Sequence, residues 1–353
     1  MNKIRLCFLI LGGMALLTPA NPGQPTPVAK EEGLLGKILA VAPPPSAIRL
    51  KSSFSFPKNA EAPGDEYFWD PYDLASDEQG DLYISDRSNT VFKYSPEGTL
   101  LAKIGRSGQG PGDLGMPFDI LISAGQLVVK ESANQRVQFF DVSGISRGSI
   151  KLYKTYCSFG LDNRGRIYGI PLFFRPDPAQ SLVDVISSEG RLERGFGRML
   201  DFPNDFQQLN LSYIFINEDK EAIVVFAYMP IMRRYALDGR LLAECPLQSE
   251  MFELKRRNNL SLYARRPDER VAYIRVAHGA SLDNGRLYLT DFVPPRLWIN
   301  EIDLSGKVCK TYWANAGEHF SPVAVVPRMK DDHPSFYVLT LTPDPRVFCF
   351  DKE

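Results

Sequence analysis

Apolar and polar positions alternate in short runs along most of the chain, and most runs end at a turn that contains glycine. Two stretches can be laid over each other with Pro71 on Pro117: PYDLASDEQGDLYISDRSNTVFKYSPEGTLLAKIG and PFDILISAGQLVVKESANQRVQFFDVSGISRGSIKL. Each predicts strand, turn, strand, polar loop, strand, turn, strand. A repeat built only of strands, with a period in the forties, is typical of a β-propeller in which each repeat forms one four-stranded antiparallel blade.

The strand count predicts how the ring closes. The first repeat predicts strands near Tyr72–Ser76, Leu82–Ser85, Val91–Tyr94 and Leu100–Ile104, and later repeats begin at Pro117 and near Ser158, Leu211, Gly279 and Pro322. The last repeat offers only three strands, while the alternating segment Ile48–Phe56 is left over upstream. We therefore predict an all-β, six-bladed propeller in which this N-terminal strand completes the last blade and removes two open edges. Five or seven blades stay open as alternatives, because an irregular insertion follows the fourth repeat.

Turn and core residues agree with this pattern. Asp, Asn, Ser or Glu precedes glycine in DEQGD, DNRGR, SPEG, ALDG, DNGR and DLSG, which is the chemistry of tight hairpin turns. Aromatic residues within the predicted strands suit the flat gaps between stacked blades. We expect a core that includes Tyr83, Phe92, Tyr94, Phe139, Phe140, Tyr168, Tyr288 and Trp298.

The N-terminus has a different pattern. Lys3 and Arg5 precede the apolar run Leu6–Leu17, and small residues follow up to Ala20. We predict a signal peptide over residues 1–20, because the run is too short to span a bilayer as a stable helix; an uncleaved anchor is the alternative. Residues 21–47 are rich in proline and predict a flexible linker, with a small amphipathic turn or docking motif as the alternative, and residues 48–353 form the propeller.

Composition and the N-terminal pattern also bear on the location of the protein and on its partners. The net charge of −1 gives no indication of nucleic-acid binding. The predicted leader indicates a periplasmic or extracellular protein with no integral membrane span after cleavage, and we expect a monomer. Four cysteines would remain, at positions 157, 245, 309 and 349; they allow two disulfides by three pairings, and four buried thiols are equally consistent.

The segment Gly80–Ile120 resembles the NHL-repeat propellers, especially the exported bacterial six-bladed β-propeller family. GDLYISD, NTVFKY and GRSGQGPGDLGMP match the family's strand and linker motifs, with Leu114 where the family often has Phe, and NQRVQFF matches in the second repeat. The specific match covers about seventy-five residues and the weaker strand-turn rhythm about three hundred. The resemblance implies the fold and leaves the activity open.

Loops gather on one predicted face. The turns between first and second strands, and between third and fourth, lie on one side of a propeller, so the remaining loops and the linkers between blades meet on the other. Because a rigid scaffold with varied loops on one face is a common site of binding, we predict that this loop face binds a protein, peptide or glycan without catalysis. The candidate binding residues are Arg106, Gln109, Asp113, Phe173, Phe174, Arg175, Phe206 and Arg296.

The resemblance also implies a hydrolase alternative. Six-bladed relatives include calcium-dependent lactonases and gluconolactonases, and Asp73 and Asp119 share a repeat position at the start of the innermost strand, where a tunnel-mouth metal could bind. Zinc-dependent amidating lyases also belong to this group, but they need several histidines, and this chain has three. We predict no catalytic residues and no cofactor, with Ca²⁺ at Asp73 and Asp119 as the alternative.

One segment lacks the strand rhythm. Residues 248–278 carry Met251, Leu254, Leu260 and Tyr263 at helical spacing, together with a cluster of basic residues. We predict a helical or irregular insertion packed on the fourth and fifth blades. Docking of an acidic partner or a membrane surface is the alternative.

Overall fold

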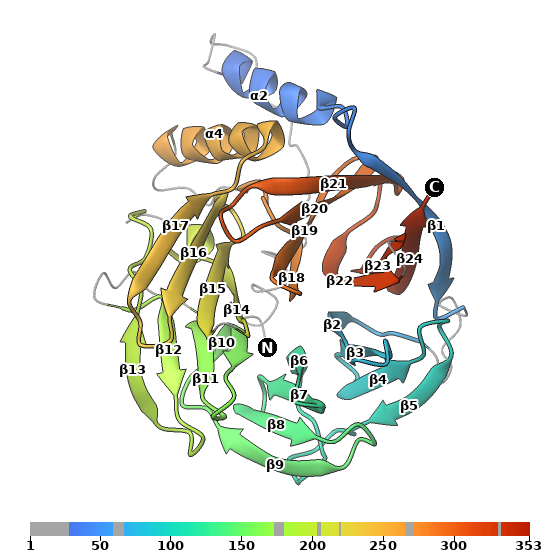
Figure 1. Ribbon diagram of the computed structural model, residues 1–353, viewed down its shortest axis with the longest axis vertical. Helices are drawn as coiled ribbons and strands as arrows, with labels where there is room; N and C mark the ends of the chain where they lie inside the picture. The colour runs from blue at the N-terminus through green and yellow to red at the C-terminus, as the bar shows by residue number, and fades with distance from the viewer. Residues whose placement is uncertain are drawn as a thin grey trace.

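Strands form nearly all of the regular structure. The computed structural model describes residues 28–58, 67–172, 180–202, 206–218, 220–265, 272–330 and 333–353. The strands make four four-stranded sheets and one eight-stranded sheet, arranged around a central axis like the blades of a propeller (Figure 1). The predicted all-β, propeller-like architecture is therefore confirmed for the described part of the chain.

Four sheets follow the predicted repeats, each antiparallel and ordered along the chain from the axis outward. The first contains β2 (Pro71–Ser76), β3 (Leu82–Asp86), β4 (Thr90–Tyr94) and β5 (Leu100–Ile104). The second contains β6 (Pro117–Ser123), β7 (Gln126–Glu131), β8 (Arg136–Phe140) and β9 (Ser146–Lys151). The third contains β10 (Tyr156–Leu161), β11 (Ile167–Pro171), β12 (Val183–Ile186) and β13 (Leu192–Phe196). The fourth contains β14 (Ser212–Ile216), β15 (Glu221–Phe226), β16 (Ile231–Ala236) and β17 (Leu241–Pro246).

The eight-stranded sheet joins the two ends of the chain. Its order is β18-β19-β20-β21-β1-β24-β23-β22. The strands are β1 (Ile48–Phe56), β18 (Gly279–Asp283), β19 (Arg286–Val293), β20 (Arg296–Ile302), β21 (Val308–Asn315), β22 (Pro322–Lys330), β23 (His333–Thr340) and β24 (Arg346–Lys352).

The N-terminal strand lies where the closure argument places it. From Leu50 to Phe56, β1 pairs antiparallel with β24, so it covers the outer edge of the last three-stranded unit. Its first two residues, Ile48 and Arg49, also pair with β21 in parallel. Because β1 bonds to both neighbours, the structure has one eight-stranded sheet where the sequence predicts two separate blades.

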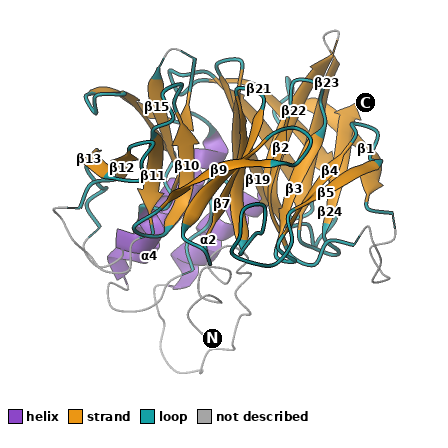
Figure 2. Ribbon diagram, turned by 90° about the horizontal axis from the view of Figure 1, so that it is seen from below, coloured by secondary structure: helices purple, strands orange, loops and turns teal. Residues whose placement is uncertain are grey.

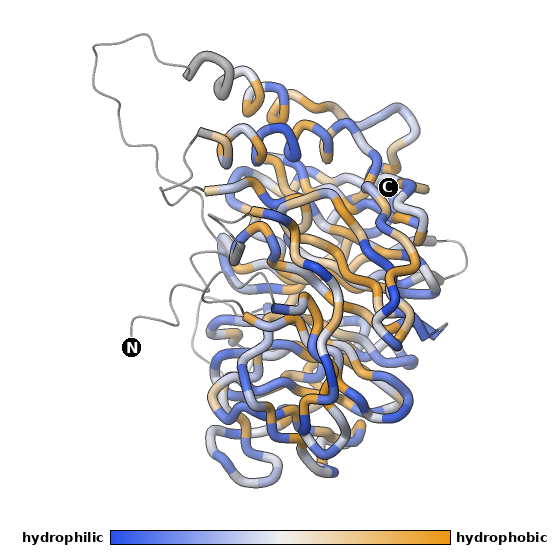
Figure 3. Tube along the Cα trace, turned by 90° about the vertical axis from the view of Figure 1, so that its left-hand side faces the viewer, coloured by the Kyte–Doolittle hydropathy of each residue, from blue (hydrophilic) through white to orange (hydrophobic). Residues whose placement is uncertain are grey.

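The core lies between adjacent sheets and around the axis. The six innermost described strands, β2, β6, β10, β14, β18 and β22, each contact the next and form a closed ring. Seven of the eight predicted core aromatics are buried, and Phe139 is partly buried. Hydrophobic stretches are frequent within the folded part, and many of the loops at its edge are hydrophilic (Figure 3).

Two helices pack together outside the ring, which corrects the predicted linker. Helix α2 (Val28–Ala40) lies beside α4 (Glu250–Arg265) in Figures 1 and 2. Ile38 is buried against Met251, and Arg296 donates a hydrogen bond to the carbonyl oxygen of Val41 (3.3 Å). A flexible linker is therefore wrong for Val28–Ala40, and the alternative of a small amphipathic docking motif fits the segment better, because Ile38 packs against α4. In the described ranges, neither these helices nor α3 (Phe206–Leu209) is long and apolar enough to cross a membrane.

The predicted helix in the insertion is confirmed, and its charges are largely used internally. Lys255 is fully buried and donates to Asp291, while Arg256 and Arg257 both pair with Glu253. These ion pairs do not favour the alternative of a basic docking surface.

The cysteines of the folded part are free thiols: Cys157, Cys245, Cys309 and Cys349 form no disulfide with one another. Of the two alternatives left open by the sequence, the one without bridges is present, but only Cys245 and Cys349 are buried; Cys157 is partly buried and Cys309 is exposed. The predicted signal peptide, residues 1–20, lies outside the described residues.

Candidate functional site

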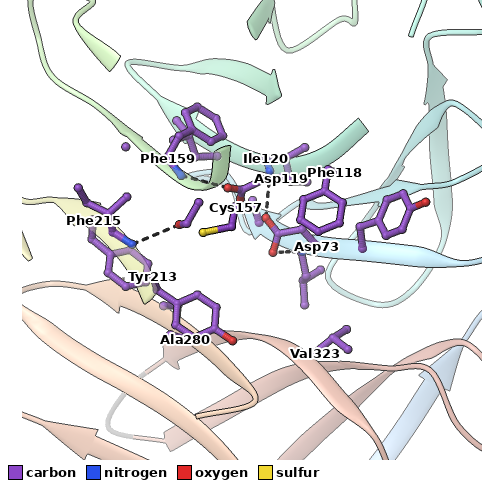
Figure 4. Close-up of a pocket in the computed structure, with 18 of the residues that line it drawn as sticks. Asp73, Phe118, Asp119, Ile120, Cys157, Phe159, Tyr213, Phe215, Ala280 and Val323 are labelled. Carbon is purple, nitrogen blue, oxygen red and sulfur yellow. Dashed lines mark hydrogen bonds between the residues drawn. The ribbon is translucent and has the colours of Figure 1, made fainter. Parts of the chain in front are cut away.

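The ring of inner strands encloses a cavity of about 670 Å³. This volume lies within the range of roughly 300 to 1,000 Å³ that is usual for sites of small organic ligands. Side chains from all six inner strands line it, and most of them are aromatic or aliphatic (Figure 4). Labelled lining residues include Phe118, Tyr213, Phe215, Ala280 and Val323. The cavity is thus a mostly apolar channel with a few polar groups on its wall.

The polar side chains on the cavity wall link neighbouring sheets, and they occupy the same position in successive inner strands. The Asp73 carboxyl accepts hydrogen bonds from the backbone N–H of Leu74 (2.9 Å) and of Ile120 in the next sheet (3.0 Å). Asp119 accepts one from the N–H of Phe159, at 3.2 Å. One sheet further on, the Ser158 hydroxyl accepts one from the N–H of Ile214, also at 3.2 Å. Each side chain therefore satisfies a backbone donor of the next inner strand, which stabilises the ring.

The two carboxyl groups also interact with each other. Both lie partly buried on the cavity side of β2 and β6 (Figure 4). Burial raises the pKa of Asp73 well above its usual range, and its contact with Asp119 raises it further. Burial also raises the pKa of Asp119, although the ammonium group of Lys130 opposes that shift. Two carboxyls in contact favour sharing one proton, so the pair titrates as a unit.

Lys130 supplies positive charge beside Asp119. Its ammonium donates to the carbonyl oxygen of Tyr156 (2.6 Å) and lies 4.6 Å from the ring centroid of Phe118. Its positive charge therefore compensates the negative charge of Asp119.

The opposite wall carries a second polar group. Tyr213 donates its hydroxyl hydrogen to the carbonyl oxygen of His278 (2.9 Å), and His278 lies 3.5 Å from Asp291. Burial lowers the pKa of His278, so the imidazole is neutral at pH 7. Arg275 also lines the cavity, and its Nε donates to the hydroxyl of Tyr228 (3.1 Å).

The carboxyls do not fit a calcium site. Asp73 accepts backbone hydrogen bonds at both of its oxygens, Asp119 accepts one, and the Lys130 ammonium competes electrostatically with a cation beside Asp119. Among the residues that the structure describes, no group of three or more His, Cys, Asp or Glu side chains is placed to hold a metal ion. A hard cation needs about six to eight oxygen ligands, which this pair does not supply.

The predicted loop-face residues are not brought together around the cavity. Arg106 pairs with Asp113 (2.8 Å), and Arg136 donates to the carbonyl oxygens of Gln109 (2.9 Å) and Asp113 (2.8 Å). These contacts stabilise the segment from Arg106 to Asp113, which connects the first two sheets. Of the predicted binding residues whose side chains are described, which are Arg106, Gln109, Asp113 and Arg296, none lines the cavity.

The other predicted binding residues cannot be placed around a site. Phe173, Phe174 and Arg175 lie outside the described residues. Phe206 begins α3, and nothing is described of its side chain.

Sequence reasoning missed the apolar wall of the channel. Phe118 and Tyr72 are neighbouring rings at equivalent positions of the first two repeats, with centroids 5.2 Å apart. Tyr213 and Ala280 lie on inner strands whose starting points the repeat pattern located. The sequence signal for this wall was the second residue of each inner strand. In the sequence alone such a residue looks like an ordinary core residue, because the cavity appears only when the strands form a ring.

No protein-family model and no curated protein matches the sequence. Many solved structures share the fold. An exported protein from Bacteroides fragilis is 10% identical, with a TM-score of 0.55 over 87% of this chain and 99% of that one. A DUF4221 family member from Bacteroides vulgatus is 8% identical, with a TM-score of 0.53 over 87% and 98%. Virginiamycin B lyase from Staphylococcus aureus is 14% identical, with a TM-score of 0.46 over 77% and 81%. For the two Bacteroides proteins, the likeness at these identities extends to the propeller-like fold alone.

Proposed function

We propose that this protein is a non-catalytic binding propeller whose ligand enters the central channel. The cavity carries the proposal, because its volume of about 670 Å³ and its mainly apolar lining are those of a site for a small organic ligand. Its walls are mainly apolar, so burial of apolar ligand surface supplies the binding free energy. The ligand class is an organic molecule or an inserted peptide side chain.

The proposal moves the binding site from the loop face to the channel. Arg106, Asp113 and Arg296 all make contacts within the chain, which favours a structural role for them. The calcium-dependent hydrolase gains no support from the donor set around Asp73 and Asp119.

The number of blades and the export of the protein are part of the same proposal. Counting the eight-stranded sheet as two four-stranded blades joined by β1 gives six blades, in agreement with the ring of six inner strands. The resemblance of Gly80–Ile120 to the NHL-repeat propellers supports the same count. Export rests on the N-terminal sequence pattern, and the Bacteroides fragilis neighbour is itself described as exported.

A neutral fluorescent probe tests channel binding. N-phenyl-1-naphthylamine brightens in apolar surroundings, and we expect the wild-type protein to bind it saturably. Ala280→Trp and, separately, Val323→Trp place an indole in the cavity from β18 and β22 and should abolish that binding.

Leu101→Trp is the matched control. Leu101 is 50% exposed on the outer strand β5, so this variant should bind like the wild type. Equal probe binding by the wild type and both cavity variants, with unchanged thermal unfolding, would contradict the proposal.

A further inference from the structure

His278 presents one ring nitrogen to the channel. Its side chain lines the cavity and is 20% exposed, although its Nδ1 is buried. The second nitrogen, Nε2, is not buried, and among the residues that the structure describes none forms a hydrogen bond with it. The accessible edge of the ring therefore carries a hydrogen-bonding atom that the chain itself leaves open, on a wall that is otherwise mainly apolar.

The rest of His278 is occupied by contacts within the fold. Its backbone N–H donates to the carbonyl oxygen of Thr290 in β19 (2.8 Å), and its carbonyl oxygen accepts the Tyr213 hydroxyl (2.9 Å). Its Nδ1 faces the carboxylate of Asp291, with 3.5 Å between Nδ1 and the nearer oxygen. The backbone and one side of the ring are thus held, which leaves Nε2 for the channel.

The carboxylate of Asp291 determines which nitrogen carries the proton. Burial opposes ionisation of Asp291, but the charge of Lys255 and the contact with His278 outweigh it, so the pKa of Asp291 lies below its ordinary value. Asp291 is therefore ionised at pH 7, and it favours a proton on the Nδ1 that faces it. A neutral imidazole has one donor and one acceptor nitrogen, so Nε2 is the acceptor.

The groups around the imidazole keep Nε2 unprotonated at neutral pH. Burial lowers the pKa of His278 below the ordinary value of 6.5, and Asp291 on β19 acts in the opposite direction. The charges of Lys255 on α4 and of Arg275 lower this pKa further. Burial raises the pKa of Tyr213 on β14 to about 12, so its hydroxyl is neutral and adds no charge.

An accessible acceptor on an apolar wall favours one kind of ligand. An apolar body that fills the channel displaces water from Nε2, and an acceptor left without a donor costs free energy. A ligand whose hydroxyl or N–H group reaches Nε2 restores the hydrogen bond. A ligand of similar shape without such a donor does not.

Resting on the proposed function of the channel, we infer that its ligand is an organic molecule with a hydroxyl or N–H donor, which bonds to Nε2 of His278 while its apolar body lies along residues such as Phe215 and Val323 (Figure 4). His278 is thus the residue that determines specificity in the channel. Recognition depends on pH, because protonation converts Nε2 from an acceptor into a donor.

A matched pair of probes tests the inference. 1-Naphthol carries a hydroxyl donor, and 1-methoxynaphthalene has the same ring system and an oxygen without a hydrogen. Displacement of N-phenyl-1-naphthylamine, followed by its fluorescence, gives the affinity of each in the channel. We expect the wild type at pH 7 to bind 1-naphthol about fivefold more tightly than its methyl ether, which corresponds to one net hydrogen bond.

A substitution of His278 identifies the residue. His278→Phe keeps a planar ring and removes the acceptor, so the affinities for the two naphthalenes should become equal. A preference that came from the larger size of the ether would persist in this variant. His319→Phe is the matched control, since His319 is exposed and does not line the cavity, and it should keep the wild-type ratio.

The pH dependence of the affinity ratio is a second measurement, and it needs no variant. As the pH falls through the pKa of His278, below 6.5, the ratio should approach one, because a protonated imidazole donates equally well to a hydroxyl or an ether oxygen. Titration of Asp73 and Asp119 affects both probes alike and cancels in the ratio. His278→Phe should show a ratio near one throughout.

The outcomes separate the two proposals. Equal affinities of the wild type for both naphthalenes at pH 7, an undiminished preference in a folded His278→Phe, or a ratio that does not change with pH overturns the inference and leaves channel binding intact. If N-phenyl-1-naphthylamine itself does not bind in the channel, the proposed function fails. Thermal unfolding of each variant shows that a changed ratio does not come from loss of the fold.

Discussion

Substitution of Phe56 by alanine tests how the N-terminal strand closes the ring. Phe56 is 1% exposed at the end of β1, and its ring centroid lies 4.7 Å from that of Tyr94 in the first sheet. It also lies against Gly98, whose φ of +80° and lack of a side chain leave room for the ring: a Cβ there would be 2.8 Å from it. One side chain therefore connects the eight-stranded sheet to the first sheet.

Truncation of a buried Phe to Ala costs about 3 to 5 kcal/mol, because apolar burial is lost and a cavity remains. At roughly 2 °C for each kcal/mol in a chain of this size, the melting temperature of Phe56→Ala should fall by about 6 to 10 °C. Circular dichroism during heating, with urea unfolding for the free energy, measures both quantities. Leu101→Ala is the control, since Leu101 is half exposed and should cost no more than about 0.5 kcal/mol. If the two variants melt within about 1 °C of each other, β1 does not close the ring as described.

Three further predictions concern buried charges and the docked helix. Lys255→Met leaves the Asp291 carboxylate buried without its main partner and should cost about 3 to 5 kcal/mol in urea unfolding, whereas Lys255→Met combined with Asp291→Asn should recover much of that loss. The pKa values of Asp73 and Asp119 are raised in the folded state, so protonation of these carboxyls stabilises the fold. This contribution to the free energy of unfolding is complete below the ordinary pKa of 3.8 and is lost as the pH rises through the raised pKa values. The free energy of unfolding of the wild type should therefore decline relative to Asp73→Ser over that rise, and parallel pH profiles would contradict the assignment. Ile38→Asp should release α2 from α4, so that limited proteolysis removes the N-terminal segment at protease concentrations that leave the wild type intact.

The repeat pattern predicts the strands well because turn chemistry marks their ends. For the first sheet, the predicted and observed bounds differ by at most one residue, as in Leu82–Ser85 against Leu82–Asp86. Glycines at positive φ, such as Gly80 and Gly98, end the strands where the sequence predicts turns. The leftover strand Ile48–Phe56 could be assigned because an open edge and an unpaired strand are both unfavourable.

Contacts between distant segments account for what the sequence analysis missed. Helix α2 depends on Met251 and neighbouring residues of α4, more than two hundred positions away, so composition alone indicates a linker. Arg296 was a candidate for ligand binding because it lies in a polar loop, yet it donates to Val41. Asp73 and Asp119 were correctly placed facing the axis, but their acceptance of backbone hydrogen bonds from the next sheet requires the ring geometry.

The most direct test of channel binding is a crystal structure of the protein with N-phenyl-1-naphthylamine bound. We expect density for the fused rings inside the channel, against Phe118, Tyr213 and Ala280. Density found solely on the outer surface or among the loops, with an empty channel, would contradict the claim that the channel is the binding site.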